Sequence, residues 1–226
     1  MSHHRKRAIR SFVLRQGRLT KGQQIALKHL WPIYGIEYAE SKLNLPNLFE
    51  RDAAITLEIG FGNGDSLATM AKAAPERNFL GIEVHRPGVG RLLHLINEYE
   101  LSNVRVIHHD AVEILKQRIP SHSIDRIQLF FPDPWHKKRH HKRRIMQPEF
   151  IQQIHSLLVT GGIFHLATDW ENYAQHMRKI MEASNNFQNL CTSPFSTRPD
   201  DRPLTKFEKR GLKLGHGVWD LLYKAL

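Results

Sequence analysis

Residues 55–64 read I-T-L-E-I-G-F-G-N-G. The run opens with apolar and β-branched residues, which are typical of a buried parallel strand. Three glycines then follow at alternate positions: Gly60, Gly62 and Gly64. Glycines directly after a strand let the backbone turn tightly and approach a ligand closely. The next segment, L-A-T-M-A-K-A-A, favours a helix that Asp65 or Ser66 would cap. Strand, glycine turn and helix together predict the nucleotide-site opening of a doubly wound α/β sheet.

The same alternation continues along the chain. We expect strands at 55–59, 78–83, 104–108, 124–131 and 163–168, with helices at 66–74, 87–100, 111–118, from Pro148 to before Gly161, and 170–183. Repeated β-then-α predicts a mostly parallel sheet with helices on both faces, a Rossmann-like arrangement. Segments 187–191 and 218–225 are expected to add an antiparallel hairpin at the sheet edge.

The N-terminal third contributes less regular structure. Residues 1–20 are expected to form a flexible basic arm, and residues 21–226 a single α/β domain. A helix is expected from Lys21 to about Leu30, because Trp31-Pro32 should end it. Residues 43–52 read as connecting material before the first long strand.

Length and composition limit the classes of protein to which the chain can belong. A chain of 226 residues with 41% hydrophobic content suits one α/β domain with a proper core. No apolar run approaches the length of a membrane span, and the N-terminus lacks a signal-type stretch. Cys191 is the only cysteine, which excludes an internal disulfide and favours a cytoplasmic setting.

Positive charge is concentrated in two places. The net charge is +11, yet no acidic residue precedes Glu37, whereas eight lysines and arginines do. A second block at 136–144, H-K-K-R-H-H-K-R-R, holds six lysines and arginines and no acid. Uniform solvation would not concentrate charge in this way. The pattern predicts a polyanionic partner, RNA or DNA.

Acidic residues surround the glycine turn. Glu58 lies two residues before Gly60, where a carboxylate would repel a pyrophosphate but suit a cationic ligand. S-adenosylmethionine fits, because its α-ammonium and sulfonium are positive and it carries no phosphate. Glu83, ending the second strand, can accept both ribose hydroxyls, and Asp110, after the third, is placed for the adenine amino group. Acids at strand ends also serve as helix caps, so this alternative stays open.

The fourth strand runs into L-F-F-P-D-P-W, residues 129–135. Asp133 stands between two prolines, which fix φ and stiffen the turn. A rigid carboxylate beside the cofactor is what positioning a reacting base requires. Trp135 would either stack on a base or pack in the core. The basic block that follows would hold the phosphates flanking a bound nucleotide.

The histidines of the basic block raise the question of a metal site. His136 and His140 have a spacing that can bind zinc on a helix. Six lysines and arginines surround them, with no cysteine or carboxylate between, so a divalent ion would be strongly disfavoured. We predict no metal.

With these motifs together, the chain resembles the bacterial tRNA (guanine-N7-)methyltransferases, which are class I S-adenosylmethionine-dependent enzymes. The resemblance extends from about Ile9 to the end of the chain. Its motifs are R-S-F-V-L-R-Q-G-R-L-T (10–20), L-E-I-G-F-G-N-G (57–64), G-I-E-V-H (81–85), F-P-D-P-W-H-K-K-R-H-H-K-R-R (131–144), A-T-D-W-E-N-Y-A (167–174) and T-K-F-E-K-R-G (205–211). The glycine motif is shared by many methyltransferases, whereas the F-P-D-P-W and T-x-F-E-x-R stretches are far more specific.

The resemblance implies roles for individual residues. Cofactor-contacting positions are Glu58, Gly60, Gly62, Gly64, Glu83, Asp110 and Asp133, of which Asp133 is the proposed catalytic one. Substrate-contacting positions are Lys137, Asp169, Thr205, Lys206, Phe207 and Glu208, and the RNA-contacting segment is Arg139, His140, His141, Lys142, Arg143 and Arg144. The family acts on the variable-loop guanosine at tRNA position 46. Asp169 can equally be the N-cap of helix 170–183.

Two rival functions stay open on sequence alone. One is a methyltransferase acting on an exocyclic amino group or a glutamine amide, since such enzymes carry a loosely similar turn after the fourth strand. The other is an RNA-binding protein with an inactive core, although the retained acids and glycines argue against it. A nicotinamide-dependent dehydrogenase is a distant third, because the glycine spacing is wrong. The chain is expected to be a monomer or a homodimer.

Overall fold

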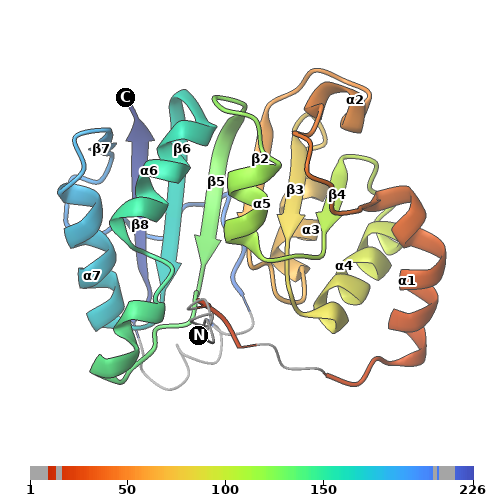
Figure 1. Ribbon diagram of the computed structural model, residues 1–226, viewed down its shortest axis with the longest axis horizontal. Coiled ribbons are helices and arrows are strands. Elements are labelled where there is room, and N and C mark those ends of the chain that lie inside the picture. Colours follow the sequence, from red (N-terminus) through yellow and green to blue (C-terminus); the bar gives the residue numbers. More distant parts are fainter. Residues whose placement is uncertain (1–9, 14–16, 206–207, 209–216) are drawn as a thin grey trace, which may run out of the picture.

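A computed structural model describes residues 10–13, 17–205, 208 and 217–226. Its centre is an eight-stranded sheet in the order β1-β4-β3-β2-β5-β6-β8-β7 (Figure 1). The strands are β1 (Gly35–Ile36), β2 (Ile55–Ile59), β3 (Asn78–Ile82), β4 (Val104–Ile107), β5 (Ile124–Phe130), β6 (Leu158–Thr168), β7 (Phe187–Asn189) and β8 (Trp219–Ala225). The first six strands in this order are linked by parallel pairs, whereas β8 pairs antiparallel with both β6 and β7. This confirms the doubly wound fold and the antiparallel C-terminal hairpin at its edge.

Helices cover both faces of the sheet (Figure 1). They are α1 (Lys21–Tyr34), α2 (Leu45–Phe49), α3 (Asp65–Ala73), α4 (Arg86–Glu98), α5 (Ala111–Gln117), α6 (Pro148–Leu157) and α7 (Glu171–Glu182), with a 3₁₀ helix η1 (Lys138–Arg143). One apolar cluster joins the sheet to α2, α5, α6 and α7, and a second joins it to α1, α3 and α4. Burying both faces of the sheet explains why the central strands are rich in apolar residues.

Three local predictions were wrong. Helix α1 runs on to Tyr34 with Pro32 inside it, and the Gly35 N–H caps it by donating to the Trp31 carbonyl. Trp31 and Tyr34 pack against the second cluster, so tertiary contacts outweigh the hydrogen bond that Pro32 cannot make. A short helix, α2, occupies part of 43–52, and the Asn44 side chain caps it.

The helix after the glycine turn also begins differently from the prediction. Its N-cap is Gly64 with φ +75°, and neither Asp65 nor Ser66 caps it. A Cβ at Gly64 would come within 2.7 Å of the Leu92 side chain on α4. Close packing of α3 against α4 therefore requires glycine here, and the turn winds directly into the helix.

Two further observations concern membrane spans and the N-terminal residues. Among the described residues, no helix combines the length and apolar character needed to cross a bilayer. Residues 10–13 lie beneath the end of β5 (Figure 1), where the Trp135 indole N–H donates to the Ser11 carbonyl at 3.0 Å. The division into a flexible arm at 1–20 and a domain at 21–226 stays a prediction.

Candidate active site

Two adjoining hollows lie at the carboxyl edge of the parallel strands. The first, here the cavity, is ≈ 220 Å³ and is lined by three of the predicted acids: Glu83, Asp110 and Asp133. The second, here the cleft, is ≈ 520 Å³, and Glu58, Gly62, Gly64 and Thr205 line it. Both hollows share the wall made by Gly60, Phe130 and Phe131. The structure therefore brings the four predicted acids and three glycines to one place.

The glycine turn is built for close backbone approach. Gly60, Gly62 and Gly64 all have positive φ, at 71°, 59° and 75°. A Cβ at Gly88, in the first turn of α4, would lie 1.9 Å from the Gly62 carbonyl oxygen. Helix α4 thus packs directly on the turn, and this contact holds the loop in its ligand-facing shape.

Glu58 is a buried carboxyl group next to the glycine turn. It is 3% exposed, and its Oε2 has no hydrogen-bond partner among the described residues. Burial, and then the neighbouring Glu83 carboxylate, raises the pKa of Glu58 to about 8. An uncompensated buried carboxylate is costly, so a positively charged ligand group at this place would stabilise its ionised form. The residues present fit the ammonium end of S-adenosylmethionine.

Glu83 has a role that the sequence did not indicate. Its Oε2 accepts from the Gly62 N–H at 2.7 Å, and its Oε1 accepts from the N–H groups of Val84 and His85 at 2.7 and 2.9 Å. Glu83 therefore fixes the glycine turn from the neighbouring strand. Each carboxylate oxygen has two acceptor sites, so one remains on Oε2. The predicted contact with ribose hydroxyls stays a prediction.

Asp110 is a helix cap that also lines the cavity. Its Oδ1 accepts from the Val112 N–H at 3.0 Å at the start of α5. Burial is the main cause that raises the pKa of Asp110. The alternative of a structural cap is thus present in the fold, and the contact with adenine stays a prediction.

Asp133 stands exposed at the mouth of the cavity on a strained turn. Phe131 and Trp135, on either side of it, have φ of +51° and +47°, a conformation that costs roughly 1–2 kcal/mol per residue. Arg144 holds the turn, because its Nε donates to the Pro134 carbonyl at 2.8 Å and its Nη2 to Asn172 Oδ1 at 2.9 Å.

Arg144 itself is buried, unlike its neighbours in the basic block. The residue is 3% exposed, and its guanidinium lies over the Tyr173 ring at 4.8 Å. Burial lowers the pKa of Arg144. The Arg144 side chain is thus enclosed and paired within the protein, and its predicted contact with RNA stays a prediction.

Arg143 also faces inward, toward residues 10–13. Its Nε donates to the Arg10 carbonyl at 3.0 Å and its Nη2 to the Phe12 carbonyl at 3.1 Å. Ser11 and Phe12 line the cavity, so Arg143 helps to build a cavity wall. Sequence analysis missed this wall because the contact joins residues more than 130 positions apart.

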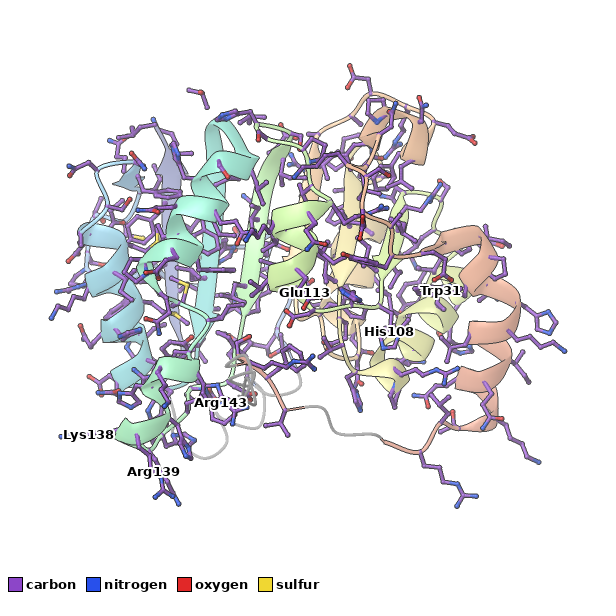
Figure 2. The ribbon with its side chains drawn as sticks, viewed as in Figure 1. Trp31, His108, Glu113, Lys138, Arg139 and Arg143 are labelled. Atoms are coloured by element: carbon purple, nitrogen blue, oxygen red, sulfur yellow. The ribbon has the colours of Figure 1, made fainter. Side chains whose placement is uncertain are left out.

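The rest of the basic block points outward. Figure 2 shows Lys138 and Arg139 extending away from the body of the molecule, whereas Arg143 lies further in. Lys137 and Lys142 are also exposed, and His140 and His141 are half-buried. The exposed cations suit the predicted contact with phosphates, which stays a prediction.

The wall at Pro203–Thr205 rests on a buried network that the sequence did not indicate. Arg202 is 0% exposed and donates to both Glu208 oxygens, at 2.7 and 2.8 Å, and to both Asp220 oxygens, at 2.7 and 2.8 Å. His165 Nε2 lies 2.9 Å from Asp220 Oδ1. Burial is the main cause that lowers the pKa of His165, which favours the neutral ring donating to Asp220.

The network includes part of the segment 205–208 that was predicted to contact substrate. Glu208 is 3% exposed and accepts hydrogen bonds from Arg202 on both oxygens, and its predicted contact with substrate stays a prediction. The Glu208 N–H donates to Thr205 Oγ1 at 3.1 Å, and Thr205 lines the cleft. Lys206 and Phe207 lie outside the described residues.

Asp169 and Lys137 line neither hollow, and their substrate contacts stay predictions. The N-cap of α7 is Trp170, so the alternative of Asp169 as N-cap was wrong. Among the described residues, no three His, Cys, Asp or Glu side chains gather closely enough to bind a metal together.

Comparisons with known proteins identify the family of the chain. A family model described as "Putative methyltransferase" (Methyltransf_4) matches residues 52–221. A tRNA (guanine-N(7)-)-methyltransferase from Aeromonas hydrophila subsp. hydrophila is 60% identical over 221 residues, covering 97% of this chain and 93% of the relative. The Escherichia coli protein of the same name is 58% identical, covering 97% and 92%.

Solved structures support the fold alone. The 16S rRNA methyltransferase KamB aligns with a TM-score of 0.61 at 13% identity, covering 83% of this chain and 95% of KamB. TrmN from Thermus thermophilus aligns with a TM-score of 0.54 at 16% identity, covering 80% and 47%. On the strength of the close relatives, the chain belongs to the tRNA (guanine-N7-)methyltransferase family.

Proposed function

We propose that this protein transfers a methyl group from S-adenosylmethionine to N7 of guanosine 46 in the variable loop of tRNA, in the cytoplasm. The observation that carries the proposal is the placement of Asp133, an exposed carboxylate on a rigid turn at the mouth of an acid-lined cavity. Exposed cations follow it directly in sequence. The names of relatives 57–60% identical over nearly the whole chain support the same activity.

The acids and glycines contact different parts of the cofactor. Glu58 holds the ammonium group, and the glycine turn, fixed by Glu83, lets the backbone approach closely. Asp110 takes the adenine amino group in the cavity. When bound, S-adenosylmethionine supplies a methyl group on a positively charged sulfur.

Guanine N7 has a lone pair and no hydrogen, so its attack on a methyl group needs no prior deprotonation. The product ring is cationic, and no proton leaves N7. Asp133 therefore orients the base, accepting from its N–H groups, and steadies the developing positive charge. Holding the reactants in line can supply about 7–11 kcal/mol of the barrier reduction.

The test is transfer of a labelled methyl group to unmodified tRNA, followed by cleavage at N7-methylguanine. We expect one cleavage, at position 46, and no labelling of a tRNA with adenosine there. A label on an exocyclic amino group would overturn the proposal in favour of another N-methyltransferase. Absence of S-adenosylmethionine binding in an equilibrium titration would instead leave an RNA-binding protein with an inactive core.

A further inference from the structure

Trp170 presents a large exposed ring on a fixed backbone. It directly follows β6 and Asp169, and it is 41% exposed. Its backbone N–H donates to Thr168 Oγ1 at 3.3 Å, and its backbone carbonyl accepts from the Tyr173 and Ala174 N–H groups at 2.9 Å. The fold thus holds this ring at a set place while leaving much of it in contact with solvent.

The position of Trp170 is next to that of Asp133. Strands β5 and β6 are parallel neighbours, paired through Phe130 and Ala167, so the turns that follow them emerge side by side. His136, three residues beyond Asp133, meets the Trp170 ring at a centroid distance of 4.2 Å and an angle of 75°. The contact fixes the indole orientation and joins the two turns.

Phe12 and Phe131 line the cavity but are only partly exposed, and the rings of Trp135 and Tyr38 already have partners. The Trp135 ring is covered by Arg143 at 3.7 Å, and its N–H is taken by the Ser11 carbonyl. Tyr38, the other exposed aromatic among the described residues, stacks on His109 at 4.5 Å. Trp170 lines neither hollow, but it follows β6 beside the turn that carries Asp133, and its ring stays 41% exposed despite the T-shaped contact with His136. It is therefore the candidate stacking surface.

We propose that Trp170 stacks on the guanine that receives the methyl group, and that His136 holds the indole in position. The inference rests on the proposed function. A base on which chemistry is done must leave its own stack, and an aromatic ring restores part of the lost stacking. Asp133 reads the polar edge of the purine while Trp170 covers its face. The exposed Lys137 and Lys138 lie in the same turn as His136, where they meet the adjoining phosphates.

The experiment measures binding of three tRNAs to wild type and variants. One tRNA is intact, one lacks the base at the target position, and one lacks the base at the next position. Trp170→Ala is expected to weaken binding of intact tRNA by roughly 5- to 150-fold, the equivalent of 1–3 kcal/mol per stacked base. Trp170→Phe should retain most of the affinity. Leu190→Ala, at a comparably exposed apolar residue beyond β7, should bind as wild type does.

The tRNA without the target base separates stacking from a structural effect. Wild type and Trp170→Ala should bind it equally, because the partner of the indole is missing. Equal weakening on intact and abasic tRNA, a dependence on the neighbouring base, or no weakening at all would each overturn the inference. S-adenosylhomocysteine affinity should be unchanged, and Trp170→Leu serves if the alanine variant does not fold. Wild type that fails to methylate guanosine 46 would overturn the proposed function instead.

Discussion

The Arg143 guanidinium lies 3.7 Å from the centre of the Trp135 ring and donates to the carbonyls of Arg10 and Phe12. A residue from the most basic part of the chain therefore supports the wall of the cavity. Basic residues that are neighbours in sequence therefore differ in their position. Some build the cavity wall and others face solvent. The first two predictions follow from this separation.

Arg143→Ala is expected to weaken S-adenosylhomocysteine binding by about 5- to 30-fold. The reason is the loss of charge-assisted hydrogen bonds, together worth roughly 1–2 kcal/mol, that hold Ser11 and Phe12 against the cavity. Isothermal titration calorimetry measures the change. Lys138→Ala, at an exposed site, is the matched control, and equal affinities for both variants would contradict the prediction.

The double variant Lys138→Ala, Arg139→Ala is expected to change tRNA binding without changing cofactor affinity. Each phosphate contact contributes about 0.7–0.9 to the slope of log K against log salt, so losing two reduces the slope by roughly 1.4–1.8. Filter binding across a salt series measures it. An unchanged slope would place the RNA surface elsewhere.

Binding of S-adenosylhomocysteine at pH 7 is expected to release close to one proton. Glu58 has a pKa of about 8 in the cofactor-free protein, so it is mostly protonated at pH 7. The ligand ammonium favours the carboxylate and drives the proton off. Affinity should therefore rise between pH 6 and pH 7. Calorimetry in buffers of different ionisation enthalpy counts the protons, and Glu58→Gln should release none from this site.

Asp133→Asn is expected to leave a measurable methyl-transfer rate that is largely independent of pH. An asparagine keeps a carbonyl acceptor for the base but loses the negative charge, and N7 has no proton to surrender. Single-turnover rates between pH 6 and pH 9 measure the effect. A residual rate that rose steeply with pH would show that Asp133 acts as a base.

Arg202→Met is expected to lower the free energy of unfolding by about 3–5 kcal/mol at pH 8, because it leaves two buried carboxylates without their partner. Urea denaturation of wild type and variant at pH 8 measures the difference. A loss smaller than about 1 kcal/mol would contradict the prediction.

Much of the fold follows from local pattern. Short apolar runs predicted β2 to β5, and the shared edge of parallel strands explains why Glu58, Glu83 and Asp110 meet. What a charged side chain faces is not local. Arg202 reaches Asp220, 18 positions away, and Trp135 reaches Ser11, 124 positions away.

Charge type alone therefore does not show what a side chain contacts. Arg144 and Glu208 carry the charges expected of RNA-facing and substrate-facing groups, yet both are buried and paired within the protein. Tertiary packing decides this, and no spacing in the sequence records it. Pro32 illustrates the same limit for the backbone, since helix α1 continues through it.

The wall shared by the cavity and the cleft has a consequence for inhibitor design. Because Gly60, Phe130 and Phe131 border both hollows, two fragments found separately in each could be linked across this wall into one molecule. A short linker that matches the span raises the effective concentration of the second fragment to the millimolar range, so potency grows without new contacts.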